Sequence, residues 1–134
     1  MTGTRETDDR IDPIRPTDDA ARDLARRLLS EARFAALGVI DPETGAPMVT
    51  RIALAPAAPG DAEAAPLTLV STLSAHTAAL TAHPACSLLV GEPGAKGDSL
   101  THPRLTLQAE AVAGDKARLR AHYLAAYPKA TLYY

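Results

Sequence analysis

Residues 34–54 read FAALGVIDPETGAPMVTRIAL, and this stretch decides the fold. Two apolar runs, at residues 34–40 and 47–54, flank a segment whose Pro42 and Gly45 supply the fixed and the positive φ that a chain reversal needs. The pattern predicts an antiparallel hairpin. Alternation in its second strand puts Arg51 among small or apolar side chains on one sheet face, where a guanidinium needs an acceptor.

The remaining patterns predict three further strands and three helices. The strands are expected at residues 67–72, 86–91 and 104–113, and the helices at residues 17–33, 74–82 and 115–127. Thr17 and Asp115 are the expected N-caps of the first and third helices. Meander-like connections favour an antiparallel barrel with appended helices, because a parallel sheet would need a helix between each pair of strands. We expect a mainly β barrel of about six strands, one of them outside these five.

Length and composition indicate one small domain that gains from a partner. The chain has 134 residues, and much of its 46% hydrophobic content is alanine, with one Phe and no Trp. Alanine buries little area, so we expect a homodimer in which a second subunit covers a further apolar face. We expect a mobile leader at residues 1–16 and the domain at residues 17–134, with further polypeptide after the apolar end at residues 131–134.

Charge and cysteine content argue against several classes of function. The net charge is −2, so no positive field would gather nucleic acid or an anionic membrane. The single cysteine, Cys86, lies in an apolar run, where we expect a small hydrophobe rather than a reactive thiol. No signal peptide is recognised, and a reducing cytoplasm is the expected location.

The four histidines do not have the spacing of a metal site. None forms the i, i+4 pair that zinc sites favour, so we predict no metal centre. His83 and His122 are expected on the solvated surface, and His102 is expected to shape the loop before the last strand. Because no acid is placed to orient His76 beside Ser71, a nucleophilic triad is not supported, and no catalytic residue is predicted.

Residues 70–77, VSTLSAHT, carry the clearest chemical signal. Three hydroxyls and an imidazole lie where a strand ends and a helix begins, and a helix N-terminus offers unpaired N–H groups and partial positive charge to an anion. Arg51 from a neighbouring strand would add a guanidinium that holds phosphate in two hydrogen bonds. The alternative is that Ser74 and Thr77 are ordinary helix caps.

Ordered segments of the chain resemble one known family. These are VTRIAL from Val49, VSTLSAHT from Val70, HTAAL from His76, and HPACSLLVGEPGAKGDSLTHPRLTLQAEA from His83. From about Leu24 to the last residue, the chain is similar to the flavin-binding split-barrel proteins related to pyridoxamine 5′-phosphate oxidase, and most similar to the branch that includes haem-utilisation proteins. The resemblance implies a split β-barrel dimer with its ligand near the subunit interface.

The resemblance also implies an FMN site. Carried over residue by residue, the cofactor-binding positions are Arg51, Ile52, Ala53 and Leu54 beside the flavin, Ser71, Thr72, His76 and Thr77 around the phosphate, and Arg104 and Leu105 from the second subunit. The chain departs from the family pattern at Ala79, Ala85 and Ala109. The short branch of the family also lacks the arginine-rich terminal segment with which the true oxidases hold pyridoxal phosphate, so vitamin B6 oxidation is not implied.

Three functions follow as alternatives. The first is a flavin-dependent oxidoreductase acting on an unidentified small molecule, with the chemistry carried by the cofactor. The second is haem binding or degradation, which the haem-utilisation branch implies and which needs an axial donor to iron. The third is a dimeric barrel that binds no flavin because Ala79 and Ala109 alter the site.

Overall fold

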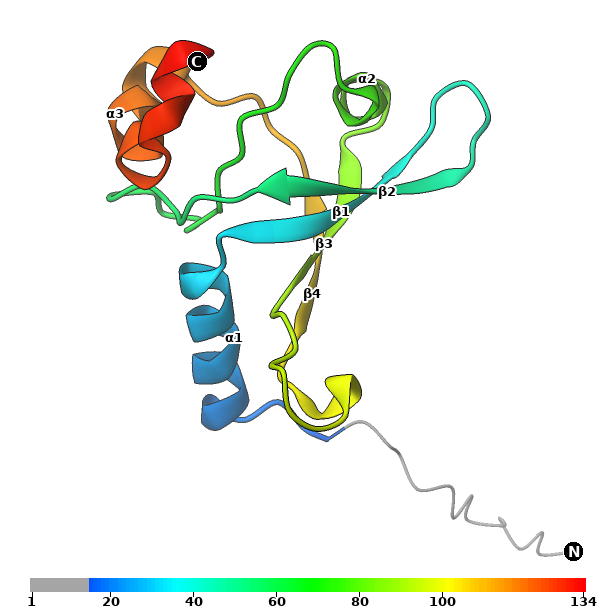
Figure 1. The fold of residues 1–134 in the computed structure, drawn as a ribbon, viewed down its shortest axis with the longest axis vertical. Coiled ribbons are helices and arrows are strands. Elements are labelled where there is room, and N and C mark those ends of the chain that lie inside the picture. The colour runs from blue at the N-terminus through cyan, green and yellow to red at the C-terminus, as the bar shows by residue number, and fades with distance from the viewer. Residues whose placement is uncertain (1–14) are drawn as a thin grey trace, which may run out of the picture.

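The computed structural model describes residues 15–134, which form one antiparallel four-stranded sheet with three α-helices (Figure 1). The strand order is β2-β1-β3-β4. The strands are β1 (Phe34–Ile40), β2 (Pro47–Ala53), β3 (Ala85–Val90) and β4 (Leu105–Glu110). The helices are α1 (Asp19–Glu31), α2 (Ala75–Ala82) and α3 (Lys116–Ala126), with short 3-10 turns η1 (Ser99–Thr101) and η2 (Pro128–Leu132). The expected leader lies almost wholly outside the described residues.

The predicted hairpin is confirmed. β1 and β2 pair from Phe34 opposite Ala53 to Ile40 opposite Pro47. The reversal is closed by hydrogen bonds from the Asp41 amide to the Ala46 carbonyl at 2.9 Å and from the Gly45 amide to the Asp41 carbonyl at 2.8 Å. Gly45 has a φ of 72°, the left-handed conformation that glycine adopts without a steric penalty.

One face of the sheet, here called the inner face, carries the hydrophobic core. Side chains alternate along each strand, so Leu37 of β1, Ile52 of β2 and Leu88 of β3 point to the same side and are buried. Both α1 and α2 pack on this core, α2 through the fully buried Ala79 and α1 through partly buried Leu28 and Leu29. Ala79, which departs from the family pattern, is therefore a core residue.

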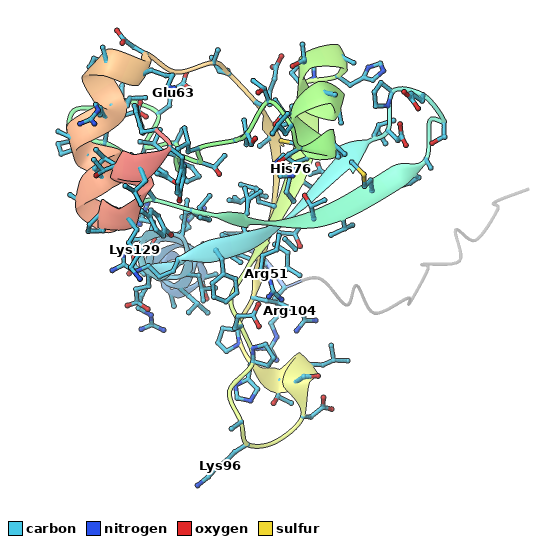
Figure 2. The ribbon with its side chains drawn as sticks, turned by 45° about the horizontal axis from the view of Figure 1, so that its top comes forward. Arg51, Glu63, His76, Lys96, Arg104 and Lys129 are labelled. Atoms are coloured by element: carbon cyan, nitrogen blue, oxygen red, sulfur yellow. The ribbon has the colours of Figure 1, made fainter. Side chains whose placement is uncertain are left out.

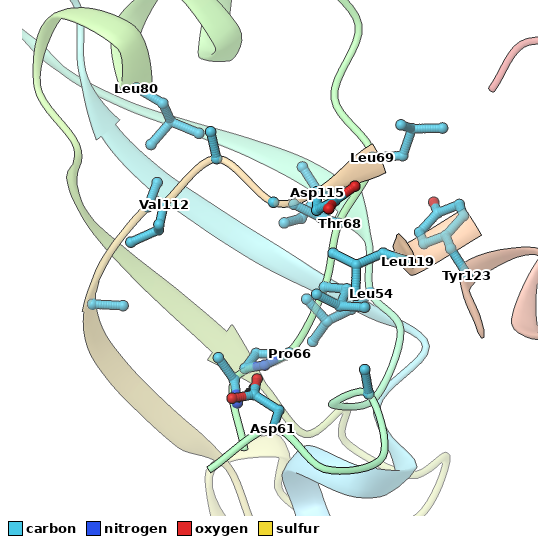
Figure 3. Close-up of a pocket in the computed structure, with 18 of the residues that line it drawn as sticks. Leu54, Asp61, Pro66, Thr68, Leu69, Leu80, Val112, Asp115, Leu119 and Tyr123 are labelled. Carbon is cyan, nitrogen blue, oxygen red and sulfur yellow. Dashed lines mark hydrogen bonds between the residues drawn. The ribbon is translucent and has the colours of Figure 1, made fainter. Parts of the chain in front are cut away.

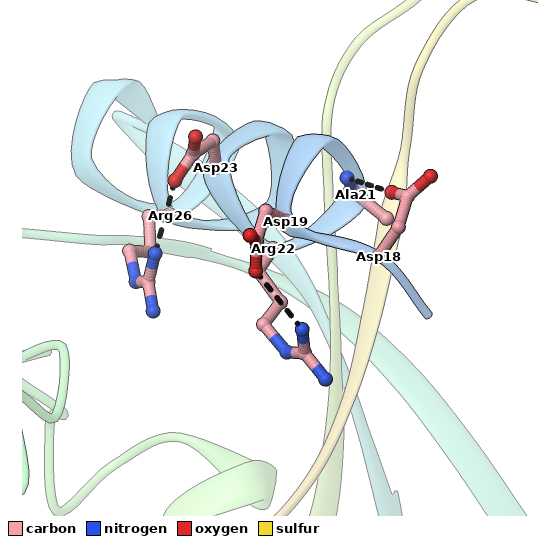
Figure 4. A network of polar contacts seen from close by, with 6 residues as sticks. All are labelled: Asp18, Asp19, Ala21, Arg22, Asp23 and Arg26. Carbon is pink, nitrogen blue, oxygen red and sulfur yellow. Dashed lines mark hydrogen bonds and ion pairs between the residues drawn. The ribbon is translucent and has the colours of Figure 1, made fainter. Parts of the chain in front are cut away.

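The N-terminus of α1 is capped by Asp18, not by the predicted Thr17. The Asp18 carboxylate accepts a hydrogen bond from the Ala21 amide at 2.8 Å, which satisfies one of the orphan donors of the first turn. Two ion pairs at i, i+3 spacing, Asp19 with Arg22 and Asp23 with Arg26, follow along the exposed side of the helix (Figure 4). Exposed pairs of this kind add little stability. The predicted cap of α3, Asp115, is confirmed, since its carboxylate accepts from the Arg118 amide.

The strand predicted at residues 67–72 does not form. This segment makes only one bridge, between Leu67 and Ala55. It follows the free edge of β2, where the Thr68 hydroxyl donates to the Ala53 carbonyl at 2.7 Å. Its apolar residues lack a second strand to pair with, so the alternating pattern alone did not produce a ladder.

The described sheet is therefore open, not a closed barrel. β4 ends at Glu110, three residues before the predicted end, because its partner β3 begins only at Ala85, opposite Glu110. The general class, a mainly β antiparallel domain with flanking helices, is confirmed, whereas the expected six-stranded closure is not seen in residues 15–134.

None of the helices in the described range is both long and apolar enough to cross a membrane. The cytoplasmic location remains a prediction.

Candidate functional site

The sheet face opposite the core, here called the open face, is the first candidate site. Its large apolar side chains remain accessible, with Phe34 40%, Leu89 43% and Val49 71% exposed. The face is formed by Phe34, Ala36, Gly38, Ile40, Val49, Arg51, Ala53, Ser87, Leu89, Thr106 and Gln108. An apolar surface of this kind in an otherwise charged protein marks a binding surface.

Small residues occupy the middle of the open face. In one cross-strand row, Gly38 lies between Val49 and Ser87, and in the next row Ala36 lies between Arg51 and Leu89. A Cβ atom placed on Gly38 would meet only Ser87, at an ordinary 3.8 Å, so the space above this glycine is open. The surface of the open face is therefore lower along this row of small side chains than at the larger side chains on either side.

A shallow depression of about 430 Å³ lies beside the Gly38 row, where the pairing of β1 with β3 ends. The open face contributes Gly38, Ile40, Val49, Ser87 and Gln108 to its lining, and Val39, Met48, Cys86 and Ala109, which alternate toward the core, border it as well. The volume is within the range of about 300–1,000 Å³ that is usual for small-molecule sites. A flat, largely apolar group is the ligand shape that suits such a surface.

Two arginines reach the same side of the sheet. Thr50 and Ile52 point to the inner face, so Arg51 between them points to the open face, and Arg104 does the same because it precedes the inward Leu105. Figure 2 shows both guanidiniums on the side of the sheet away from His76. The Arg51 guanidinium lies 5.5 Å from the centre of the Phe34 ring, and Arg104 donates to the Leu100 carbonyl at 2.9 Å. Both remain exposed and can pair with anionic groups.

The start of α2 is a separate arrangement. His76 is half-buried on the inner side, where its Nδ1 lies 3.0 Å from the Thr50 hydroxyl. The hydroxyls of the predicted phosphate site serve local structure, since the Thr77 hydroxyl donates to the Ser71 carbonyl at 2.5 Å and the Ser71 hydroxyl accepts from the Leu73 amide at 3.1 Å. Ser74 is the N-cap residue but makes no side-chain capping bond.

The structure does not bring the predicted residues together as one side-chain cluster. Arg51 and His76 lie on opposite sides of β2. Ile52 and Leu54 are core residues, 6% and 2% exposed, and Leu105 packs against the same core, because the period of two along a strand directs them inward. Of the ten positions, those whose side chains belong to the open face are Arg51, Ala53 and Arg104, while Ser71, Thr72, His76 and Thr77 gather at the start of α2.

The other titratable residues have structural surroundings. His102 shapes its loop as predicted: its Nδ1 accepts from the Gly94 amide at 3.2 Å, and its Nε2 lies 2.7 Å from the Lys96 carbonyl. The prediction that His122 is solvated is wrong, because this residue is half-buried and its Nε2 lies 2.8 Å from the Pro56 carbonyl. Burial raises the pKa of the Cys86 thiol. Among residues 15–134, no cluster of three or more His, Cys, Asp or Glu could hold a metal ion.

Sequence reasoning missed the centre of the open face. Gly38 and Ser87 meet only through the pairing of β1 with β3, which the sequence does not specify. One signal was available, since a glycine inside an apolar strand often marks a place where a ligand or another backbone approaches closely.

The fold and the open face together define a class: an antiparallel sheet with helices on one face and a shallow, arginine-flanked apolar site on the other. No family model matches the chain. A segment of 73 residues is 41% identical to "Non-canonical heme oxygenase HOZ, chloroplastic" of Arabidopsis thaliana, covering 52% of this chain and 22% of that protein.

Solved structures share the fold. The Agrobacterium tumefaciens protein Atu2129, of unknown function, is 33% identical with a TM-score of 0.73, covering 90% of this chain and 52% of that one. A haem-binding protein from Mycobacterium smegmatis is 28% identical with a TM-score of 0.67, covering 90% and 47%. HutZ, a haem storage protein from Vibrio cholerae, is 17% identical with a TM-score of 0.59, covering 81% and 72%, a similarity of fold alone. The chain thus spans about half the length of the first two structures and about a fifth of the Arabidopsis protein.

Proposed function

We propose that the protein binds haem on the open face of its sheet. The observation that carries the proposal is the depression lined by Gly38, Ser87 and apolar side chains, with the Arg51 guanidinium outside its lining in the adjoining row of the open face. Haem is a flat apolar ring with two carboxylates, so its chemistry matches this surface. The names of the Arabidopsis and Mycobacterium relatives support haem rather than FMN as the ligand.

Each part of the open face has a role in this proposal. Gly38 and Ser87, with the small Ala36 in the adjoining row, leave room for the ring, and Val49 supplies an apolar wall that excludes water from it. Arg51 and Arg104 pair with the propionate groups, since a guanidinium holds a carboxylate through two parallel hydrogen bonds. Bound haem would supply an iron centre whose reactivity depends on its axial ligand.

The axial donor is proposed to come from outside residues 15–134 of the same protomer. His76 lies on the inner side of the sheet, and both ring nitrogens of His102 have partners within their loop. His122 has its Nε2 beside the Pro56 carbonyl, and His83, the C-cap residue of α2, does not line the depression. Met48 and Cys86 border the depression, but both side chains pack on the core of the inner face. The described residues therefore fit the ring and the propionates of haem, and a second subunit or a further segment would provide the iron ligand.

We also propose that the protein is a homodimer of the split-barrel family, with the ligand near the subunit boundary. The exposed Phe34, Val49 and Leu89 give each protomer an apolar surface that a second copy can cover. A two-fold axis would bring the same surface from both subunits together.

FMN is the second candidate ligand, and one observation favours it. The guanidiniums of Arg51 and Arg104 share a side of the sheet and suit a phosphate as well as a carboxylate. With FMN bound, the protein would be a flavin-dependent oxidoreductase whose substrate is a small molecule. If neither ligand binds, the protein is a dimeric barrel without a cofactor.

Paired absorbance titrations with haemin and with FMN on one preparation test these proposals. We expect a saturable Soret band and no flavin uptake. Arg51→Ala should weaken haem binding by roughly ten-fold to a hundred-fold, because a charged hydrogen bond contributes about 1.5–3 kcal/mol. Arg27→Ala, an exposed arginine on α1, is the matched control and should bind as the wild type does. Flavin uptake without a Soret band would reverse the order of the two candidates.

A further inference from the structure

A cavity of about 480 Å³ lies on the inner side of the sheet (Figure 3). Its lining includes Leu37, Ile52 and Leu88, which also belong to the hydrophobic core. This cavity therefore extends the core, and none of the four histidines lines it. Outside this cavity and the depression of the open face, His102 is a histidine whose two ring nitrogens both have partners.

His102 holds together the loop that joins β3 to β4. Figure 2 shows this loop extending away from the sheet, with Lys96 at its far end and Arg104 at its base. Across the loop, the Gly94 amide donates to Nδ1 of His102 at 3.2 Å, and Nε2 lies 2.7 Å from the Lys96 carbonyl. The half-buried ring also packs closely on Gly94, since a Cβ atom placed there would lie 3.0 Å from its Cε1. One imidazole thus ties together both sides of the loop.

These two partners determine which nitrogen of His102 carries the hydrogen. The Gly94 amide can only donate and the Lys96 carbonyl can only accept, so Nδ1 must be the acceptor and Nε2 the donor. A protonated imidazole has a hydrogen on both nitrogens, which would turn two donors toward each other at Gly94. Histidine is the side chain whose charge ordinarily changes between pH 5 and 8. Protonation therefore removes one of the two hydrogen bonds that the ring makes across the loop.

The charged groups around the loop do not replace that hydrogen bond. On the loop and at its base, the charged side chains are Glu92, Lys96, Asp98 and Arg104. The Asp98 carboxylate accepts from the Leu100 amide at 2.9 Å. In α1, which contacts β4, the Asp18 carboxylate caps the helix and Asp19 pairs with Arg22. Among residues 15–134, the ion pairs lie within α1, and none includes His102.

We propose that His102 is a pH-sensitive contact that keeps the β3–β4 loop ordered while its ring is neutral and loosens residues 92–101 when the ring is protonated. Loop order is present above the pH at which His102 ionises and is lost as the pH falls through it. The Arg104 guanidinium donates to the Leu100 carbonyl of the same loop, so loosening the loop also frees Arg104 at the open face. This inference does not depend on haem binding.

Backbone ¹⁵N relaxation of the ligand-free chain at pH 7.5 and pH 5.0 tests the proposal. At pH 7.5 the loop amides should have order parameters near about 0.85, and at pH 5.0 those of Gly94 and its neighbours should fall below about 0.6. The amides of β1 should keep their values at both pH values, because the sheet does not depend on His102. Ring nitrogen shifts should show His102 neutral at pH 7.5, with its hydrogen on Nε2.

Two variants separate ionisation of His102 from other effects of pH. His102→Gln has no ionisable ring, so its loop should have the same order parameters at both pH values, whether ordered or mobile. His83→Gln, at an exposed histidine after α2, is the matched control and should keep the wild-type change with pH. Unchanged order parameters in the wild type, or a change with pH that persists in His102→Gln, would overturn the proposal.

Discussion

Gly91 is the position at which the fold most strictly requires a glycine. It follows β3 with a φ of 96°, and a Cβ atom there would lie 2.6 Å from the Pro103 carbonyl oxygen and 2.8 Å from the Cα atom of Arg104. Both contacts are with backbone, which cannot rotate away as a side chain can. The close approach sets where the chain enters β4, and with it the position of Arg104 on the open face.

Replacing Gly91 with alanine should therefore destabilise the protein by about 3 kcal/mol or more, from positive φ and backbone clash together. Gly97→Ala is the matched control, because Gly97 has a φ of 81° but a Cβ atom added there would have nothing within 4 Å, and its cost should be only about 1 kcal/mol. Urea denaturation measures both. Equal losses for the two variants would show that the backbone contact at Gly91 is not limiting.

At the scale of elements, α3 is joined to the sheet by Tyr127. Its hydroxyl lies within hydrogen-bond reach of the Arg33 carbonyl, and 2.6 Å from the carbonyl of the buried Leu54. Nearby, Tyr123, Ala55 and Ala130 form a second small core. Burial is the main cause that raises the pKa of Tyr123, with the neighbouring tyrosines adding to it. Together these contacts hold the end of the chain against the segment after β2.

Tyr127→Phe should lower the free energy of unfolding by about 1–3 kcal/mol, because the Leu54 carbonyl loses its donor in a buried position. Tyr133, which is 72% exposed, supplies the control, since Tyr133→Phe should change stability by less than about 0.5 kcal/mol. Thermal unfolding followed by circular dichroism gives both values. If the two variants unfold alike, Tyr127 does not join the elements in the way described.

An element can be predicted from the sequence when local interactions form it, and cannot when it depends on pairing with a distant segment. The hairpin at residues 34–53 and the three helices follow from local patterns, turn chemistry and caps, so they could be predicted closely. The segment at residues 67–72 has the same alternation as a strand, but a ladder needs a partner at each paired edge, and this segment found only Ala55. The extent of β4 likewise depends on where β3 begins.

At the scale of the whole molecule, the open face should hold the homodimer together. Val49→Asp adds a charge to a side chain that is 71% exposed in one protomer, so the fold should be retained while the apolar contact between subunits is lost. Light scattering should change from a dimer to a monomer mass. Leu73→Asp, at a 95% exposed position in the turn before α2, should remain dimeric. A monomeric wild type at micromolar concentration would contradict the dimer.

The candidate site could be predicted only in part. The arginine at position 51 was found from its place in an alternating strand, and its side of the sheet follows from that alternation. The placement of Arg51 and His76 on opposite sides of β2 in this protomer could not be predicted, because sequence spacing does not show which side of β2 a neighbouring helix covers. The Gly38 and Ser87 surface required the pairing of β1 with β3, which only the structure provides.

A haemin titration of Gly38→Val tests the central claim most directly. The substitution puts a side chain into the depression of the open face, and the protein should fold normally because the new Cβ atom meets only Ser87 at 3.8 Å and valine favours a strand. We expect unfolding at or above the wild-type temperature and haem affinity at least about ten-fold weaker, a difference of about 1.4 kcal/mol. A well-folded Gly38→Val protein that forms the Soret band with wild-type affinity would contradict a haem site on this face.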